Sequence, residues 1–143
     1  MNNQWENGPP DSADALDRIV HLSNLVGAEE ALVQPGGGNT SIKVDDPEGG
    51  GDTHLLVKGS GTDLRTIGRD GFTRLSMTRL AELSGRSTMS DEAMMQFLAE
   101  CMLDPGQPVP SVETPLHSIL PFRVIVHTHD IATISWRCRA YVR

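Results

Sequence analysis

The stretch RVIVHTHD, residues 123–130, has the pattern of a short buried strand that ends in two histidines. Because successive strand side chains point to opposite faces, Ile125, His127 and His129 are predicted to share one face. Two imidazoles about 7 Å apart along one face can converge on a single metal ion. The alternative is a pair of histidines at an exposed strand end that binds nothing, so the rest of the sequence has to decide between the two.

The totals of the sequence limit the class of protein. The 143 residues suffice for one domain, and the net charge of −7 offers no basic surface to a nucleic acid or an anionic membrane. No apolar run approaches the roughly 20 residues that span a bilayer, and the N-terminal MNNQWENGPP lacks the features of a secretory signal. Two cysteines are too few for a disulfide framework. We therefore expect a cytoplasmic protein with a flexible leader over residues 1–10.

Capping residues and apolar spacing predict the helices, and alternation predicts the strands. The expected strands are residues 40–44, 54–58, 72–75 and 123–130, with a solvated turn at 45–52. The first expected helix runs from a cap at Asp11 or Ser12 to about Val26, with Gly27 as its stop, and the second covers residues 78–83. A third follows the cap Ser90 and buries Met94, Phe97, Leu98 and Cys101. A fourth starts at Pro115 after the cap Thr114, and a fifth covers residues 131–135 after the cap Asp130.

Two glycine-rich turns stand next to predicted strands. The first glycine turn, residues 34–39 (QPGGGN), leads into a strand, and the second glycine turn, residues 59–64 (GSGTDL), follows one. Glycine allows positive φ and lets a ligand approach main-chain N–H groups, which together can bind an anion. A flexible lead-in to a hairpin is the alternative for the first turn alone. Two such turns at strand ends can face one anionic group from two sides.

Glu113 stands at a predicted junction between a loop and a helix, close to free N–H groups. It is either a first-turn carboxylate that the helix dipole favours, or a metal ligand or general base beside His127 and His129. His117 follows four residues later, and we expect it to be a packing residue or to support the site from behind.

Five segments in this order, GGGNTSIK, LLVKGSGTDL, SDEAMM, PSVETPLH and VIVHTHD, resemble the class II aldolase/adducin N-terminal domain family. The most similar branch is the rhamnulose-1-phosphate aldolase fused to a short-chain dehydrogenase, in which KGSGTDL and S-x-E-T-x-x-H are usual. The resemblance implies an α/β fold, namely a three-layer α/β/α sandwich around a mainly antiparallel central sheet. It also implies assembly as a homo-oligomer, usually a tetramer.

The resemblance further implies a zinc site and a phosphate site. His127 and His129 match the two zinc-binding histidines of the family, and Glu113 matches the glutamate that contacts zinc and acts as acid and base. The family's substrate phosphate lies against three turns, which match Gly38 and Asn39, Ser60 and Gly61, and Ser111. Val112 stands where some fuculose-phosphate enzymes have a second serine, so one phosphate donor is missing.

The implied reaction is zinc-dependent cleavage of a deoxyketose 1-phosphate, such as rhamnulose 1-phosphate, to glycerone phosphate and an aldehyde. Two alternatives stay open: an adducin-like assembly module without activity, and a related zinc lyase or epimerase. The family completes its zinc site with a third histidine well downstream, and none of the other three histidines stands in the matching place. We therefore expect a partial domain over residues 11–135, an aberrant tail over 136–143, and little or no turnover.

Overall fold

A computed structural model of the chain describes residues 8–46, 49–85 and 88–140. Its strands form one antiparallel sheet in the order β3-β2-β1-β4, which confirms the predicted sheet type. β4 ends two residues before His129, so only the first histidine of the pair lies on the strand. The bounds are β1 Asn39–Asp45, β2 Thr53–Lys58, β3 Phe72–Ser76 and β4 Val124–His127.

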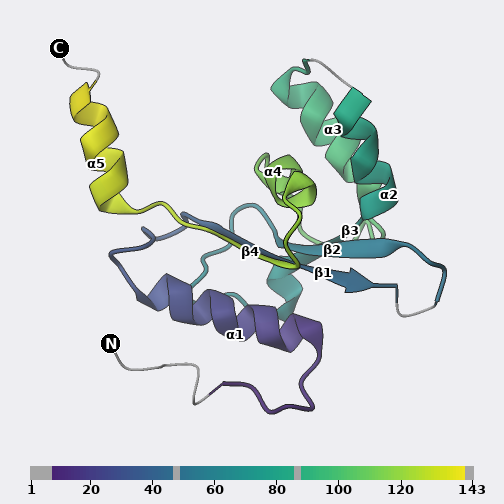
Figure 1. Cartoon of the computed structure of the whole chain (residues 1–143), viewed down its shortest axis with the longest axis horizontal. Coiled ribbons are helices and arrows are strands. Elements are labelled where there is room, and N and C mark those ends of the chain that lie inside the picture. The colour runs from purple at the N-terminus through teal and green to yellow at the C-terminus, as the bar shows by residue number, and fades with distance from the viewer. Residues whose placement is uncertain (1–7, 47–48, 86–87, 141–143) are drawn as a thin grey trace.

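Helices lie on both faces of the sheet, which confirms the three-layer α/β/α arrangement (Figure 1). α1 covers one face, and α2, α3 and α4 lie over the other, while α5 extends away from the end of β4. The bounds are α1 Ala15–Ala28, α2 Met77–Leu80, α3 Asp91–Cys101, α4 Thr114–Ile119 and α5 Ile131–Ala140, with short 3-10 helices η2 Arg69–Gly71 and η3 Ala81–Gly85. None of the described helices is long and apolar enough to cross a membrane.

The alternation of side chains along β2 creates two cores. Leu55 and Val57 point into the cluster that α2 and α3 cover, and Cys101 is buried there as predicted. Leu56 points the other way and joins Ile19 of α1. A strand with apolar side chains on both faces is therefore the central element that holds the two helical layers together.

The predicted bounds of the first two helices are wrong. α1 begins at Ala15 with Asp14 as its cap, because the Asp14 carboxylate accepts from the N–H of Asp17 at 2.8 Å, and it runs through Gly27. A Cβ at Gly27 would lie 2.2 Å from the Arg65 nitrogen, so this glycine allows close packing and does not stop the helix. The predicted helix over 78–83 is a short α2 followed by the 3-10 helix η3.

Two of the predicted caps of the last three helices are confirmed, and one is wrong. Ser90 caps α3 as predicted, with its Oγ accepting from the N–H of Ala93. Asp130 accepts from the N–H of Ala132 at the start of α5, also as predicted. Glu113, and not Thr114, occupies the cap position of α4. α5 continues to Ala140, so a helix occupies part of the segment predicted as an aberrant tail.

The predicted flexible leader over residues 1–10 lies mostly outside the described residues, and its described part, residues 8–10, has no regular structure. Residues 141–143 of the predicted tail also lie outside the described part of the chain.

Candidate metal and anion site

The register of β4 against β1 sets the first part of the site. His127 lies opposite Asn39, and Ile125 lies opposite the buried Ser41. Ile125 is 7% exposed, whereas its strand neighbours Val124 and Val126 are 42% and 41% exposed. This difference confirms the predicted alternation, with Ile125 and His127 on the inner face of β4.

Glu113 lies between the two histidines. Its Oε1 is 3.3 Å from His129 Nε2, and its Oε2 is 3.6 Å from His127 Nδ1. The side-chain amide of Asn39 donates to Oε2 at 3.2 Å. All three side chains of the cluster are half-buried, with 26% of Glu113, 28% of His127 and 38% of His129 exposed. The carboxylate is thus held by protein groups and remains open to a ligand.

These residues fit a divalent cation. One ligand atom from each of Glu113, His127 and His129 lies within 4.8 Å of the others, and no other group of three such residues occurs in the described residues. Imidazole and carboxylate are the donors that Zn²⁺ takes in catalytic sites. His127 Nδ1 is buried and has no hydrogen-bond partner within the described chain. Leaving a buried polar atom unpaired is costly, which is consistent with a place for a ligand.

His117 supports this cluster from the inside. It is fully buried on α4, its Nδ1 lies 2.7 Å from Ser41 Oγ, and its ring centre is 6.2 Å from that of His127. Burial, and next the neighbouring His127, lower the pKa of His117 to about 4. The ring is therefore neutral near pH 7 and acts as a packing residue behind His127, as the sequence predicts.

The two glycine turns meet each other through one carboxylate. Asp63 Oδ2 accepts from the N–H of Gly36 at 2.7 Å, and Asp63 Oδ1 accepts from the N–H of Arg65 at 2.8 Å. Gly36, Gly38 and Gly61 all have positive φ, between 71° and 79°. The first turn therefore needs glycine for its shape, and the second turn fixes its position.

Several polar groups of the predicted phosphate-binding residues already have hydrogen-bond partners in the protein. Asn39 donates to Glu113, and Ser111 Oγ accepts from the N–H of Glu113 at 3.2 Å. The N–H of Ser60 is occupied by the carbonyl of Val109. These groups thus belong to one network around Glu113 and its loop, with the exposed side chain of Ser60 at its rim. An antiparallel bridge pairs Gly59 with Pro110 and brings the second turn beside the loop that carries Ser111.

Lys58 is a candidate site residue that our sequence analysis missed. It is 4% exposed at the end of β2, and its ammonium has no hydrogen bond or ion pair with a described residue. Burial lowers the pKa of Lys58, and the negative charges of Glu113 and Asp63 oppose that shift. The signal in the sequence was a lysine that follows Leu-Leu-Val and stands directly before Gly-Ser-Gly, but it was assigned only to the strand over residues 54–58.

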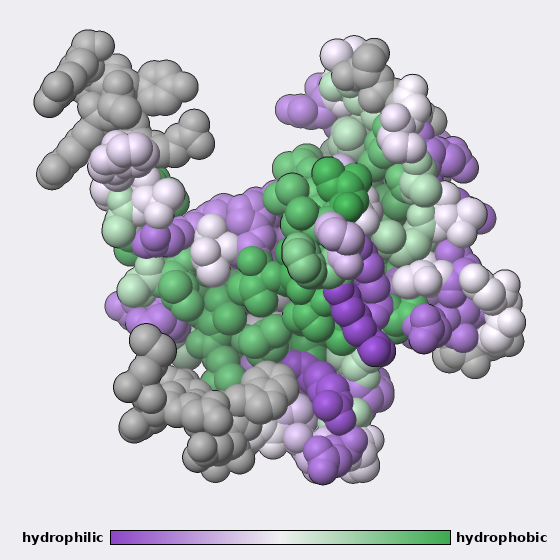
Figure 2. Space-filling view, viewed as in Figure 1, coloured by the Kyte–Doolittle hydropathy of each residue, from purple (hydrophilic) through white to green (hydrophobic). Residues whose placement is uncertain are grey.

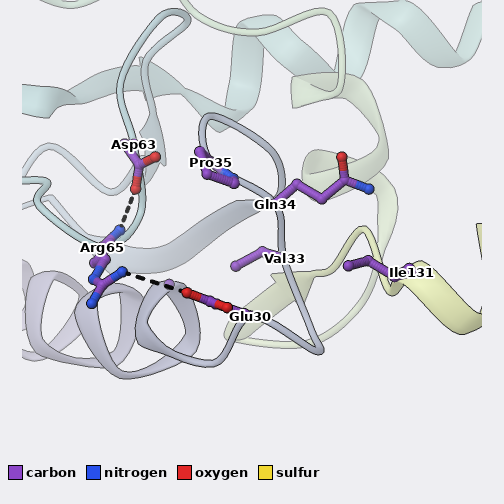
Figure 3. A pocket seen from close by; sticks show the side chains of 8 residues that line it. Glu30, Val33, Gln34, Pro35, Asp63, Arg65 and Ile131 are labelled. Carbon is purple, nitrogen blue, oxygen red and sulfur yellow. Dashed lines mark hydrogen bonds and ion pairs between the residues drawn. The ribbon is translucent and has the colours of Figure 1, made fainter.

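A cavity of about 290 Å³ lies behind the first glycine turn (Figure 3). Neither Glu113 nor the two histidines line it, so it is separate from the metal cluster. Asp63 stands at its edge and contacts Arg65, whose guanidinium reaches toward Glu30. Its lining is Gly27, Glu30, Val33, Gln34, Pro35, Asp63, Arg65 and Ile131.

Comparison with known proteins gives this geometry a family context. The chain is 39% identical over 125 residues to the uncharacterized oxidoreductase YuxG of Bacillus subtilis (strain 168). This alignment covers 86% of this chain and 18% of the Bacillus protein. It is also 39% identical to a solved N-terminal class II aldolase domain of a conserved protein from Thermoplasma acidophilum. That superposition has a TM-score of 0.83 and covers 94% of this chain and 63% of the other.

The chain therefore spans less than a fifth of the curated relative and less than two thirds of the solved chain. Residues 17–142 match the class II aldolase and adducin N-terminal domain. Because this match extends over most of the 143 residues, the chain belongs to the class II aldolase and adducin N-terminal domain family.

Proposed function

We propose that this domain cleaves a carbon–carbon bond of a sugar phosphate with the help of Zn²⁺, in the manner of an aldolase. The observation that carries the proposal is the position of Glu113, whose two oxygens lie 3.3 Å and 3.6 Å from the nitrogens of His129 and His127. An assembly module without activity has no need of such a cluster. Zn²⁺ at these ligands would supply Lewis-acid stabilisation of negative charge on a substrate oxygen.

Glu113 is the residue to which we assign proton transfer. Asn39 donates to Oε2, which orients the carboxylate and leaves Oε1 beside His129. A carboxylate held in this way can take a proton from a carbon next to a carbonyl group and return it, provided that the substrate lies within hydrogen-bond reach. In the cleavage direction, Glu113 would take the proton of the hydroxyl group that becomes the aldehyde oxygen as the carbon–carbon bond breaks. It would then give a proton to the carbon of the ketone fragment.

Lys58 and the two glycine turns are the groups to which we assign the phosphate. Lys58 is a largely buried residue whose ammonium makes no hydrogen bond or ion pair with a described residue, although Glu113 and Asp63 lie close enough to influence its charge. Such a lysine favours an anionic ligand, and a charge-assisted hydrogen bond would repay part of its desolvation. Gly38, Asn39, Ser60, Gly61 and Ser111 are the further phosphate-binding candidates, with Asn39 and Ser111 already engaged around Glu113. Anchoring a group that does not react would keep the reacting carbons in register.

Rhamnulose 1-phosphate or a similar deoxyketose 1-phosphate is our proposed substrate. The segment KGSGTDL supports this branch, and the longer Bacillus relative is named an oxidoreductase, which is consistent with it. A dehydrogenase fused to the aldolase domain would remove the aldehyde that the cleavage releases.

An assembly role is the second candidate, because apolar side chains gather on the surface. Figure 2 shows hydrophobic surface that extends from α4 across β4. Ile119, Phe122 and Val126 are 69%, 64% and 41% exposed. Contiguous apolar surface of this kind marks an interface, and a homo-oligomer such as a tetramer would cover it. This role is compatible with catalysis.

The test is a partial reaction that needs only the metal, the base and the phosphate site. The zinc-loaded chain is incubated with glycerone phosphate in D₂O, and loss of a carbon-bound hydrogen is followed by NMR. We expect exchange that stops with a chelator and that falls by about 10²-fold or more in Glu113→Gln. Glu100→Gln, on the exposed side of α3, is the matched control. Equal exchange in Glu113→Gln and the wild type would remove Glu113 as the base.

A further inference from the structure

We propose that Asp63 is a positioning residue that braces the first glycine turn and thereby holds His129 in place for the metal. The inference rests on the proposed metal centre for its functional part. The brace itself is a separate structural statement about residues 34–39 and 59–64, and it can be tested in the absence of metal. Asp63 does not touch Glu113, His127 or His129 in any hydrogen bond or ion pair among the described residues.

His129 needs a support that the sheet does not provide. His127 is held by its register opposite Asn39, but β4 ends at His127 and the ladder does not reach His129. The ring of His129 nevertheless has a defined orientation, with Nε2 directed at Glu113 Oε1 at 3.3 Å. The opposite side of the ring, at Nδ1, must therefore rest against something else.

The first glycine turn is that support. A Cβ built on Gly37 would lie 3.0 Å from His129 Nδ1, and a Cβ built on Gly38 would lie 3.0 Å from the carbonyl oxygen of His127. The turn thus packs against both histidines, and Gly37 leaves just enough room for the ring. A displacement of this turn would change the position of His129 directly.

Asp63 fixes the turn from the opposite side. Its Oδ2 accepts from the N–H of Gly36, a residue 27 positions earlier, while its Oδ1 accepts from the N–H of Arg65. Figure 3 shows Asp63 on the second turn, beside Pro35 of the first. Both carboxylate oxygens are thus engaged with main-chain donors, and together they tie two turns that the sequence separates. The chain of contacts runs from Asp63 through Gly36 and Gly37 to His129.

Groups that orient a metal-binding histidine change affinity for the metal although they do not bind it, typically by 10-fold to 100-fold. We expect Asp63→Ala to weaken Zn²⁺ binding by about tenfold, near the lower end of that range, because the brace acts through main chain. Asp63→Asn keeps one acceptor and should show a smaller loss. Asp70→Ala removes a nearby exposed carboxylate and should bind Zn²⁺ like the wild type.

The experiment measures two quantities on each full-length variant. Zn²⁺ affinity is obtained by competition with a chromogenic chelator, and hydrogen exchange of the Gly36 amide is measured by NMR on the metal-free protein. Asp63→Ala should speed the exchange of this amide and weaken Zn²⁺ binding together. A methyl group at Gly37 would lie 3.0 Å from His129 Nδ1 and 3.2 Å from the Gln34 carbonyl oxygen, while the Asp63 carboxylate still accepts from the N–H of Gly36. Gly37→Ala should therefore weaken Zn²⁺ binding while the Gly36 amide stays protected.

Unchanged Gly36 exchange in Asp63→Ala would overturn the brace, and faster exchange with unchanged Zn²⁺ affinity would overturn its role in positioning His129. If the wild type bound no Zn²⁺, the proposed metal centre would be wrong. The brace would then be judged by Gly36 exchange and by the ring signals of His129, which Asp63→Ala should shift and Asp70→Ala should not.

Discussion

The two faces of β4 differ sharply. On the inner face, Ile125 and His127 lie against β1 and α4, among buried polar groups that are joined to one another. On the outer face, Val124 and Val126 are about 40% exposed, and α5 continues outward with Ile134 exposed as well. The same four-residue strand therefore carries an ordered site on one face and, on the other, apolar side chains that the described residues leave partly exposed.

This difference supports a division in which the inner face of β4 serves the proposed chemistry and the outer face serves the proposed assembly. The cluster of Glu113, His127 and His129 draws its support from β1, α4 and the glycine turns, all within this chain. The outer face has side chains typical of a buried strand, and the described residues leave about 40% of Val124 and Val126 exposed. A ten-residue helix such as α5 is marginal by itself in water and depends on tertiary contacts for its stability. The described residues can therefore form the site on their own, whereas the assembly that we propose would cover the outer face.

Two neighbouring substitutions on β4 test the difference between its faces most strongly. Ile125→Ala should lower the free energy of unfolding by about 3 kcal/mol, because it leaves a cavity in a packed interior. Val124→Ala, on the outer face, should cost less than about 1 kcal/mol. Urea denaturation of both variants measures the two values. Equal losses would show that the outer face is buried in solution.

The pH dependence of stability tests the inner face. The pKa of His117 is about 4 in the folded chain against an ordinary value of 6.5. Between these values the unfolded state binds a proton that the folded state does not. Stability of the metal-free protein should therefore be constant above about pH 6.5 and fall as the pH drops toward 4, by up to about 3 kcal/mol. In His117→Gln this part of the pH dependence should disappear; its persistence would exclude His117 as the cause.

The buried charge near the turns allows a third test. Lys58→Met keeps the length of the side chain and removes its charge, so the KM for glycerone phosphate in the exchange assay should rise by roughly 10-fold to 100-fold. Ser60→Ala, at the rim, should raise it less. Dihydroxyacetone, which has no phosphate, should be unaffected by either change. A parallel loss with the unphosphorylated compound would mean that Lys58 does not bind phosphate.

Substitution on the outer face of β4 should have the smallest effect, and this effect should be on self-association. We expect the 143-residue chain to self-associate at high concentration through the apolar surface at β4 and α5. Val126→Thr should reduce this association and leave Zn²⁺ affinity unchanged. Sedimentation velocity over a concentration series measures it. A monomer at all concentrations would show that this surface needs no cover.

The sheet and the inner face of β4 were predictable because alternation with period two is a local property of the sequence. Ser90 and Asp130 were likewise identified as caps, since a cap acts over three residues. The start of α1 was not predicted correctly, because Asp11, Ser12 and Asp14 are all residues that can cap a helix. The role of Gly27 depends on Arg65, which packs against it from a distant segment and leaves no local pattern.

The site shows the same division between local and distant information. Family resemblance indicated Glu113, His127 and His129, and the structure brings them within one cluster. Lys58 and Asp63 escaped notice because their importance depends on tertiary contacts. Lys58 looks like an ordinary strand end until its burial is known, and the bond from Asp63 to Gly36 spans 27 residues.

The central claim is that Glu113, His127 and His129 form one metal centre, and a zinc titration against a competing chelator tests it most directly. The wild-type chain should bind one Zn²⁺ weakly, because water would have to complete the coordination. His127→Ala/His129→Ala should abolish this binding, and His21→Gln, which lies outside the cluster, should leave it intact. Unchanged Zn²⁺ affinity in the double variant would contradict the claim.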